Sequence, residues 1–164
     1  MKWVVSFILA WASICVPEEV SNHHEVINDL RQNFSLSGIL KADEGFVYVD
    51  IEDGFIYRFI DQSSKEGFDL PPYFGPGLVG AHITVIYPDE LQQYGLKDFE
   101  GLGERIPFEL KECQIVFPKS WEGVEQVFLV TVEAPILDEF REKYGLPKRK
   151  YDYHITLGVK LKNL

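Results

Sequence analysis

Hydrophobic and polar positions follow two different periods along this chain, and the first regular segment has the helical one. Between Pro17 and Phe34, apolar residues recur near one face at Val20, Ile27 and Leu30, and acidic residues follow the proline. Proline is tolerated in a first helical turn, and acidic side chains there interact favourably with the helix dipole. The pattern therefore predicts a helix over residues 17–34 with one face on a core.

Most of the later apolar segments have the composition of β-strands. They are rich in Val, Ile, Phe and Tyr, and turn residues separate them. Asp53-Gly54 is a strong hairpin signal, and a proline follows two of the later segments. We expect strands at Gly45–Asp50, Phe55–Asp61, Leu78–Tyr87, Ile106–Phe117, Val124–Glu133 and Tyr151–Lys160.

Two more helices and a loop complete the expected order of elements. Pro135–Tyr144 begins with proline, has apolar residues at helical spacing and ends before Gly145, which predicts a short helix. A second short helix is expected around Asp89–Tyr94, and Gln62–Gly77 is rich in proline and glycine and is expected to be a loop. Tight turns favour antiparallel pairing with helices on the sheet, so the predicted class is α+β. Residues 17–164 are expected to form one domain, because no linker divides them.

An identical tripeptide occurs in two of the predicted strands. His82-Ile83-Thr84 lies in the third strand, and His154-Ile155-Thr156 lies in the last. The 164 residues include only three threonines and four histidines, so chance is a poor explanation of the repeat. A single copy of such a tripeptide is most often structural. Two copies in matching strands favour a shared function.

Strand geometry gives each tripeptide one polar face. Residues i and i+2 of a strand point to the same side, so each histidine shares a face with its threonine while the isoleucine faces the core. Imidazole has a pKa of about 6.5, so a neutral ring can accept a proton from water while a charged ring protonates a leaving oxygen. Threonine hydroxyls donate to phosphoryl oxygens. We therefore predict His82 and His154 as catalytic residues, and Thr84 and Thr156 as substrate-binding residues.

A metal site and a binding module are the two alternatives to this interpretation. A zinc site requires three or four His, Cys or carboxylate ligands, which two histidines and two hydroxyls do not supply, so no metal or other cofactor is expected. Asp152, two residues before His154, either orients that ring or belongs to a solvated strand end. The alternative to an enzyme is an exported module that binds a nucleotide or phosphate without turnover.

The two His-x-Thr motifs, and the strand, strand and helix between them, resemble the two-histidine (2H) phosphoesterase superfamily, which includes the bacterial LigT-type RNA cyclic phosphodiesterases. The resemblance covers roughly Phe46–Lys160, and its specific signals are the two tripeptides. It implies two pseudo-symmetric lobes of mainly antiparallel sheet with flanking helices and an active cleft between them. It also implies metal-independent hydrolysis of 2′,3′-cyclic phosphates, or of related phosphodiester ends, on nucleotides or RNA.

The charge of the chain limits its partners. The formal net charge is -10, and an acidic surface repels duplex nucleic acid, so a small nucleotide or an RNA end is the expected partner.

The basic cluster Lys148-Arg149-Lys150 either draws a phosphate toward the site or lies in a solvated loop. Tyr87, Tyr151 and Tyr153 are candidates for stacking on a base, with packing as the simpler alternative. Cys113 lies in an alternating pattern and is expected to be a core residue rather than a nucleophile.

The first sixteen residues predict an export signal. Lys2 precedes the apolar stretch Trp3–Val16, which is shorter than the roughly 20 residues that span a bilayer. Ala10-Trp11-Ala12 is a candidate cleavage site. We therefore predict a signal peptide at residues 1–16, and a secreted or periplasmic protein without a stable membrane span after cleavage. The alternatives are an N-terminal membrane anchor, lipidation at Cys15 and a buried N-terminal strand.

Overall fold

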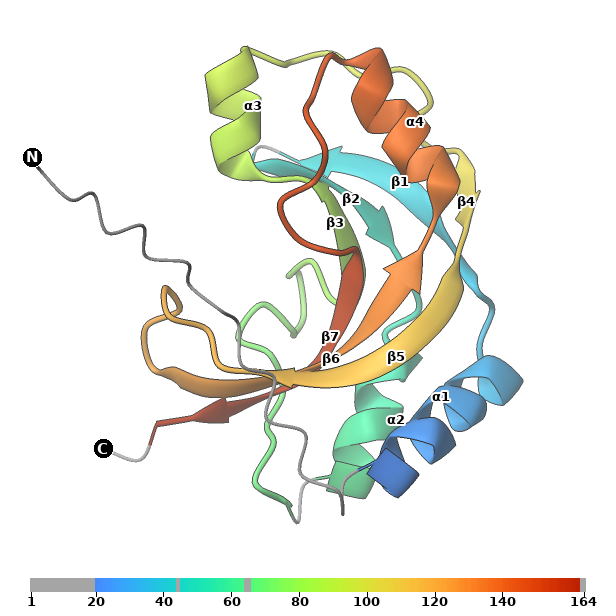
Figure 1. Cartoon of the computed structure of the whole chain (residues 1–164), viewed down its shortest axis with the longest axis vertical. Coiled ribbons are helices and arrows are strands. Elements are labelled where there is room, and N and C mark those ends of the chain that lie inside the picture. Colours follow the sequence, from blue (N-terminus) through green and yellow to red (C-terminus); the bar gives the residue numbers. More distant parts are fainter. Residues whose placement is uncertain (1–19, 44, 64–65, 163–164) are drawn as a thin grey trace, which may run out of the picture.

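The computed structural model describes residues 20–43, 45–63 and 66–162. In the described residues, the strands form one antiparallel sheet with helices packed around it (Figure 1). The helices are α1 (Val20–Asn33), α2 (Gly54–Ser63), α3 (Pro88–Tyr94) and α4 (Pro135–Lys143). The strands are β1 (Ser37–Asp43), β2 (Phe46–Asp50), β3 (His82–Ile86), β4 (Arg105–Pro107), β5 (Glu109–Val116), β6 (Val124–Glu133) and β7 (His154–Leu161).

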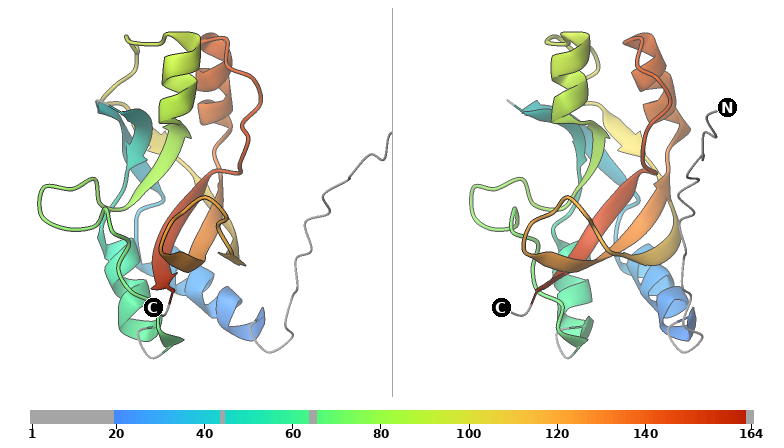
Figure 2. Two further views of the ribbon diagram at one scale, coloured as in Figure 1. Left: turned by 90° about the vertical axis from the view of Figure 1, so that its left-hand side faces the viewer. Right: turned by 60° about the vertical axis from the view of Figure 1, so that its left-hand side comes forward.

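The chain repeats one arrangement of elements. β1, β2, α2 and β3 form a first ββαβ unit, and β5, β6, α4 and β7 form a second. The strand order is β4-β1-β2-β3-β7-β6-β5, so each unit builds one half of the sheet and the last strands of the two units pair at its centre. The sheet is strongly curved but not closed (Figure 2). The predicted α+β class is confirmed, and the two pseudo-symmetric lobes are the two halves of one continuous sheet.

The two edge strands of the sheet are consecutive in the chain. β4 pairs with β1 in the first half, and β5 pairs with β6 in the second. Only Phe108 lies between them, and its side chain is buried. The single strand predicted over Ile106–Phe117 is therefore two strands, β4 and β5, because the chain passes from one edge of the sheet to the other at Phe108.

The helices cover the two ends of the curved sheet. α1 and α2 lie at one end, and α3 and α4 lie at the other (Figure 1). The isoleucines of both tripeptides, Ile83 and Ile155, are fully buried in the main core together with Phe55 and Ile56 of α2. The motif side chains on either side of Ile83 are partly exposed, as expected for a strand with one polar face.

The hairpin predicted after β2 is wrong. The segment Phe55–Asp61 lies in α2, where Phe55, Ile56 and Phe59 are buried and the residues between them are exposed. Aromatic and β-branched residues give this segment the composition of a strand, but its buried positions have helical spacing. β2 pairs instead with β1, a strand that sequence analysis missed because its second half is exposed and polar.

The other expected elements are present, and two of them are shorter than predicted. The motif strands, predicted over Leu78–Tyr87 and Tyr151–Lys160, begin at His82 and His154. Gly80 and Asp152, each two residues before a motif histidine, lie outside the strands, and their carbonyl oxygens contact the histidine rings. The confirmed elements are α1 in the described part of residues 17–34, β2, α3, α4 and β6.

The predicted export signal, the boundary between residues 16 and 17 and the cysteine at position 15 lie outside the described residues. Within the part of the chain that the structure describes, no helix combines the length and the apolar character needed to cross a membrane.

Candidate active site

The two tripeptides lie side by side at the centre of the sheet. β3 and β7 pair antiparallel through the central isoleucines of the two motifs. His82 therefore lies opposite Thr156. By the same register, Thr84 lies opposite His154. Opposite Cβ atoms in such a pair are about 4.5–5.5 Å apart and diagonal neighbours about 7–8 Å apart, so the two histidines occupy one diagonal of this four-residue site.

The same backbone contact holds both imidazole rings. Nδ1 of His82 lies 2.8 Å from the carbonyl oxygen of Gly80, and Nδ1 of His154 lies 2.8 Å from that of Asp152. A carbonyl oxygen only accepts hydrogen bonds, so Nδ1 carries the proton and donates it. In each neutral ring the unprotonated nitrogen is then Nε2, and its lone pair can accept a proton from water.

The pKa values of both histidines are lowered. Burial is the main cause for His82; the hydrogen bond to Gly80 opposes it, and the charge of His154 lowers the pKa further. Burial also lowers the pKa of His154, against the opposing effects of Asp152. Both rings are therefore mainly neutral near pH 7, and protonation of one disfavours protonation of the other. A bound phosphate anion would raise both pKa values and favour the charged ring that acid catalysis requires.

Aromatic side chains surround one histidine of the pair. The ring centroids of Phe46 and Tyr48 lie 5.5 and 5.9 Å from that of His82, and the two rings stack on each other. Tyr73 approaches the same imidazole edge-on, with centroids 4.9 Å apart. Among the described residues, no aromatic ring makes such a contact with His154. The hydrogen bonds of the two histidines are thus alike, but their surroundings differ.

Gly80 is the backbone residue that positions His82. Its φ is +75°, and a Cβ at this position would lie 2.3 Å from Oδ1 of Asp53. That carboxylate oxygen accepts a hydrogen bond of 2.9 Å from the backbone N–H of Ala81. Only glycine combines this φ with so close a neighbour. The turn therefore fixes the carbonyl group that accepts the proton of His82 Nδ1.

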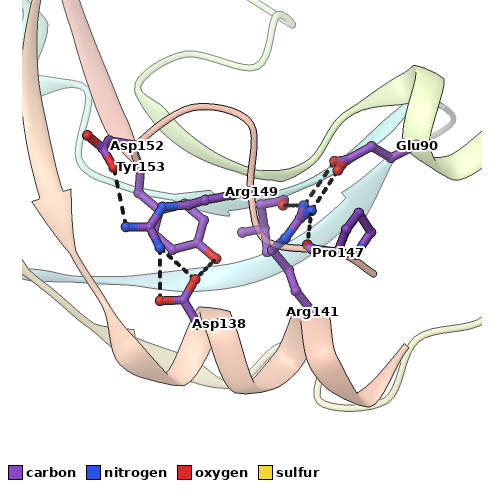
Figure 3. A network of polar contacts seen from close by, with 8 residues as sticks. Glu90, Asp138, Arg141, Pro147, Arg149, Asp152 and Tyr153 are labelled. Carbon is purple, nitrogen blue, oxygen red and sulfur yellow. Dashed lines mark hydrogen bonds and ion pairs between the residues drawn. The ribbon is translucent and has the colours of Figure 1, made fainter. Parts of the chain in front are cut away.

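A buried arginine of α4 connects the two motif strands (Figure 3). Arg141 is 2% exposed. It donates to the carbonyl of Val85 in β3 at 2.8 Å, and to the carbonyl of Pro147 in the loop before β7 at 3.0 Å. Its guanidinium also binds both carboxylate oxygens of Glu90 in α3, at 2.6 and 2.9 Å. The network therefore holds β3, α3, α4 and the loop that leads to His154 in one arrangement.

Arg149 of the predicted basic cluster stabilises that same loop (Figure 3). Its guanidinium donates to both oxygens of Asp138 at 2.7 and 2.9 Å, and lies 4.5 Å from the ring centroid of Tyr153. The carboxylate of Asp152 lies 3.4 Å from Arg149, while its main-chain carbonyl orients the second motif histidine. Attraction of a phosphate stays a prediction for the two lysines that flank Arg149, which are exposed.

The predicted stacking tyrosines differ in their surroundings. Tyr153 is buried and its hydroxyl donates to Asp138 at 3.1 Å, so it is a packing residue. Tyr151 is half exposed, and its ring centroid lies 6.0 Å from that of Tyr87. A stacking role stays a prediction for these two residues. Cys113 is buried, and burial raises its pKa to about 12, as expected of a core cysteine.

Sequence analysis missed Tyr73, which lies in the loop between α2 and β3. Its ring packs against His82. Its ring is also within 15° of parallel to that of Trp121, in the loop between β5 and β6, at a centroid distance of 6.4 Å. An aromatic residue among the prolines and glycines just before the first motif is the signal that could have identified it.

The polar side chains of the site are therefore two imidazoles and two threonine hydroxyls, and the ring of Tyr73 packs beside one of the imidazoles. In the described ranges, no group of three or more His, Cys, Asp and Glu side chains is placed to hold a metal ion. Hydroxyl and imidazole N–H groups donate to phosphoryl oxygens, and imidazoles also transfer protons near neutral pH.

The two central strands of this repeated ββαβ fold carry paired imidazoles and paired hydroxyls. This combination is typical of proteins that use acid–base groups on phosphate esters. A family model described as "Swiss Army Knife, 2H phosphoesterase domain" matches residues 47–164. The match covers more than half of the chain, and the protein belongs to this 2H phosphoesterase family, which makes it a hydrolase of the phosphoesterase kind. No solved structure matches the chain.

Proposed function

We propose that this protein hydrolyses 2′,3′-cyclic phosphates, or related phosphodiesters at nucleotide or RNA ends, with His82 and His154 as acid–base catalysts and without a metal ion. The observation that carries the proposal is the diagonal pair of imidazoles, each anchored through Nδ1 so that Nε2 can transfer protons. A phosphorus atom between the two rings would have one imidazole on the side of the attacking water and the other on the side of the leaving oxygen.

The proposed reaction uses one ring as a base and the other as an acid. Water adds to phosphorus while a neutral imidazole accepts a proton from that water at Nε2. The bond from phosphorus to the 2′ or 3′ oxygen breaks, and the protonated imidazole donates its Nε2 proton to that oxygen. The product is a phosphomonoester with a free hydroxyl. Proton exchange with solvent then returns both rings to their starting states.

The threonines have a separate role in this proposal. Each hydroxyl has one proton to donate, so Thr84 and Thr156 would bind the phosphoryl oxygens that do not take part in bond breaking. Negative charge on these oxygens is stabilised by donors that are already in position. The net charge of -10 supports a small nucleotide or an RNA end as the partner, because an acidic surface repels duplex nucleic acid.

The test is hydrolysis of the four nucleoside 2′,3′-cyclic phosphates by the full chain in the presence of EDTA. We expect turnover that resists EDTA and falls by about 10²–10⁴-fold in each of His82→Ala and His154→Ala. His24→Ala, at an exposed position of α1, is the matched control and should retain wild-type turnover.

Three results would count against the proposal. Loss of turnover in EDTA would contradict metal independence, and full turnover in either motif variant would contradict paired catalysis. Nucleotide binding without turnover, with affinity that survives the loss of one histidine, would favour the binding module instead.

We also propose that the protein is exported through its N-terminal segment, with an N-terminal membrane anchor as the alternative. The apolar stretch after Lys2 and the small residues at Ala10 and Ala12 support this. The test is fractionation of the cells that produce the protein, with mass spectrometry of its N-terminus. A cytoplasmic protein that retains residues 1–16 would contradict export.

A further inference from the structure

Two aromatic rings from different halves of the molecule lie beside the first motif histidine. Tyr73 belongs to the loop between α2 and β3, and Trp121 belongs to the loop between β5 and β6. Their ring centroids are 6.4 Å apart, and their planes differ by only 15°. Both residues are partly exposed. The two rings thus have nearly the same orientation, and one flat group can stack in parallel with both of them.

The chain around these rings holds them in place. The ring of Tyr73 packs against His82 with centroids 4.9 Å apart, and its backbone carbonyl accepts a hydrogen bond of 3.3 Å from the N–H of Gly80. The backbone carbonyl of Trp121 accepts a hydrogen bond of 3.3 Å from the N–H of Val124, where β6 begins. A binding surface that is already ordered loses less entropy when a ligand binds to it.

The surface between Trp121 and the motifs is apolar. Leu129 of β6 lies opposite Thr156, so its side chain shares the face of the sheet that carries the motif residues. It belongs to a small apolar cluster that is separate from the main core, and Trp121 packs against this cluster. The buried members of the cluster are Val124, Val127, Leu129 and Val159. The corner of the site formed by His82 and Thr156 therefore continues into an apolar surface.

Two other aromatic pairs beside the motifs have a different geometry. Phe46 and Tyr48 stack directly on each other with centroids 4.7 Å apart, and Tyr48 is only 8% exposed. The rings of Tyr87 and Tyr151 are inclined to each other by 68°. Neither pair therefore offers two partly exposed and nearly parallel faces to one flat group.

We infer that Trp121 and Tyr73 form a subsite for the base of a bound nucleotide. The base stacks on these two rings while its phosphate contacts His82 and Thr156 beside them. This inference rests on the proposed function and goes beyond it, because it assigns a position to the nucleoside as well as to the phosphate. Every base has a flat face, so the subsite should accept all four bases.

The test compares Trp121→Leu with the wild type on two substrates. One is a nucleoside 2′,3′-cyclic phosphate, and the other is methyl riboside 2,3-cyclic phosphate, in which a methoxy group replaces the base. Loss of the stacking ring should lower kcat/KM for the nucleoside substrate by about 5- to 100-fold. The loss should fall mainly on KM, because the base is remote from the bond that breaks. For the substrate without a base, kcat/KM should change little.

Two further variants sharpen the comparison. Trp121→Phe keeps a ring face and should retain most of the preference for the nucleoside substrate. Phe117→Leu changes an aromatic residue of the same loop that is 66% exposed, and it is the matched control, which should behave as the wild type on both substrates.

Three results would overturn the inference and leave the proposed reaction intact. One is equal kcat/KM of the wild type for the two substrates, which would mean that the base is not bound. Another is an equal loss on both substrates in Trp121→Leu, which would show that the ring supports the fold rather than the base. The third is a loss confined to the nucleoside substrate in Tyr151→Leu and absent in Trp121→Leu, which would place the base against Tyr151.

Tryptophan fluorescence separates the inference from the proposed reaction. Trp121 is the only tryptophan after residue 11. Binding of adenosine 3′-monophosphate, followed by calorimetry, should quench the fluorescence of the wild type and not that of Trp121→Phe. If cyclic phosphates are not hydrolysed, quenching that depends on Trp121 still supports the base subsite, whereas nucleotide binding without quenching overturns it. If the wild type neither hydrolyses cyclic phosphates nor binds the nucleotide, both proposals fail.

Discussion

Gly80→Ala is the sharpest test of how the first motif histidine is held. An alanine at φ +75° costs about 1–2 kcal/mol relative to glycine. Its Cβ would lie 2.3 Å from Oδ1 of Asp53, so the carboxylate has to move, and its hydrogen bond to Ala81 would be lost at a cost of about 0.5–1.5 kcal/mol. We expect the two effects together to lower the free energy of unfolding by about 2–3 kcal/mol.

Gly77→Ala is the matched control, because it lies in the same loop with φ +76° and has no atom within 4 Å of the added Cβ. It should show the backbone strain alone. Urea denaturation should therefore place Gly80→Ala below Gly77→Ala by about 1 kcal/mol. The kcat/KM for a cyclic phosphate should fall by about 10²-fold in Gly80→Ala, because the carbonyl that orients His82 is displaced, and should stay near wild type in Gly77→Ala.

Equal stability and equal kcat/KM in the two alanine variants would refute this reasoning. The close approach of Asp53 to Gly80 would then have no energetic cost, and the orientation of His82 would not depend on this turn. A loss of stability without a loss of kcat/KM would refute only the second half of the argument.

Four further predictions concern Arg141, the two motif histidines and Cys113. Arg141→Met leaves the carboxylate of Glu90 without its guanidinium partner, although the hydrogen bond from the backbone N–H of Tyr87 remains, and should lower the free energy of unfolding in urea by about 3–5 kcal/mol. A loss under about 1 kcal/mol would mean that solvent screens the pair. An NMR titration should give His82 a pKa below 6.5, and His154→Asn should raise it by removing a positive charge; an unchanged value would show that the rings do not interact. Because both histidines have folded pKa values below their unfolded ones, the unfolded state binds more protons, and stability should fall as the pH drops through about 6.5 and level off below the folded values. Cys113 should resist alkylation in the native protein and react in urea, as mapped by mass spectrometry, and rapid native labelling would contradict its burial.

The candidate site could be located from the sequence because its signal is local. Alternation within each tripeptide already separates the polar face from the isoleucine that enters the core. The diagonal placement of the histidines could not be predicted, since it depends on pairing between Ile83 and Ile155, which are far apart in the chain. A shift of one residue in that register would bring one isoleucine opposite a histidine or threonine of the other motif.

The errors have a common physical origin in tertiary packing. Phe55–Asp61 has strand composition, but burial against the core selects the helix whose apolar face it forms. Tyr73 belongs to a loop, and loop residues have no periodic pattern that reveals which distant side chains they contact. Gly80 falls within the strand predicted over Leu78–Tyr87, and its contact with Asp53 depends on where α2 begins.

The junction between β3 and β7 has the geometry of an isologous dimer interface contained within one chain. In a true two-fold dimer, each contact across the axis occurs twice, and one substitution changes both copies. Here the two copies are separate positions of a single polypeptide, so each can be changed alone. Three aromatic rings surround His82, and none makes such a contact with His154 among the described residues. The two histidines therefore have different surroundings although their backbone contacts are alike. A site with two unequal halves can thereby bind a ligand whose two sides differ. A phosphate ester is such a ligand, because water attacks on one side of phosphorus and the leaving oxygen departs on the other.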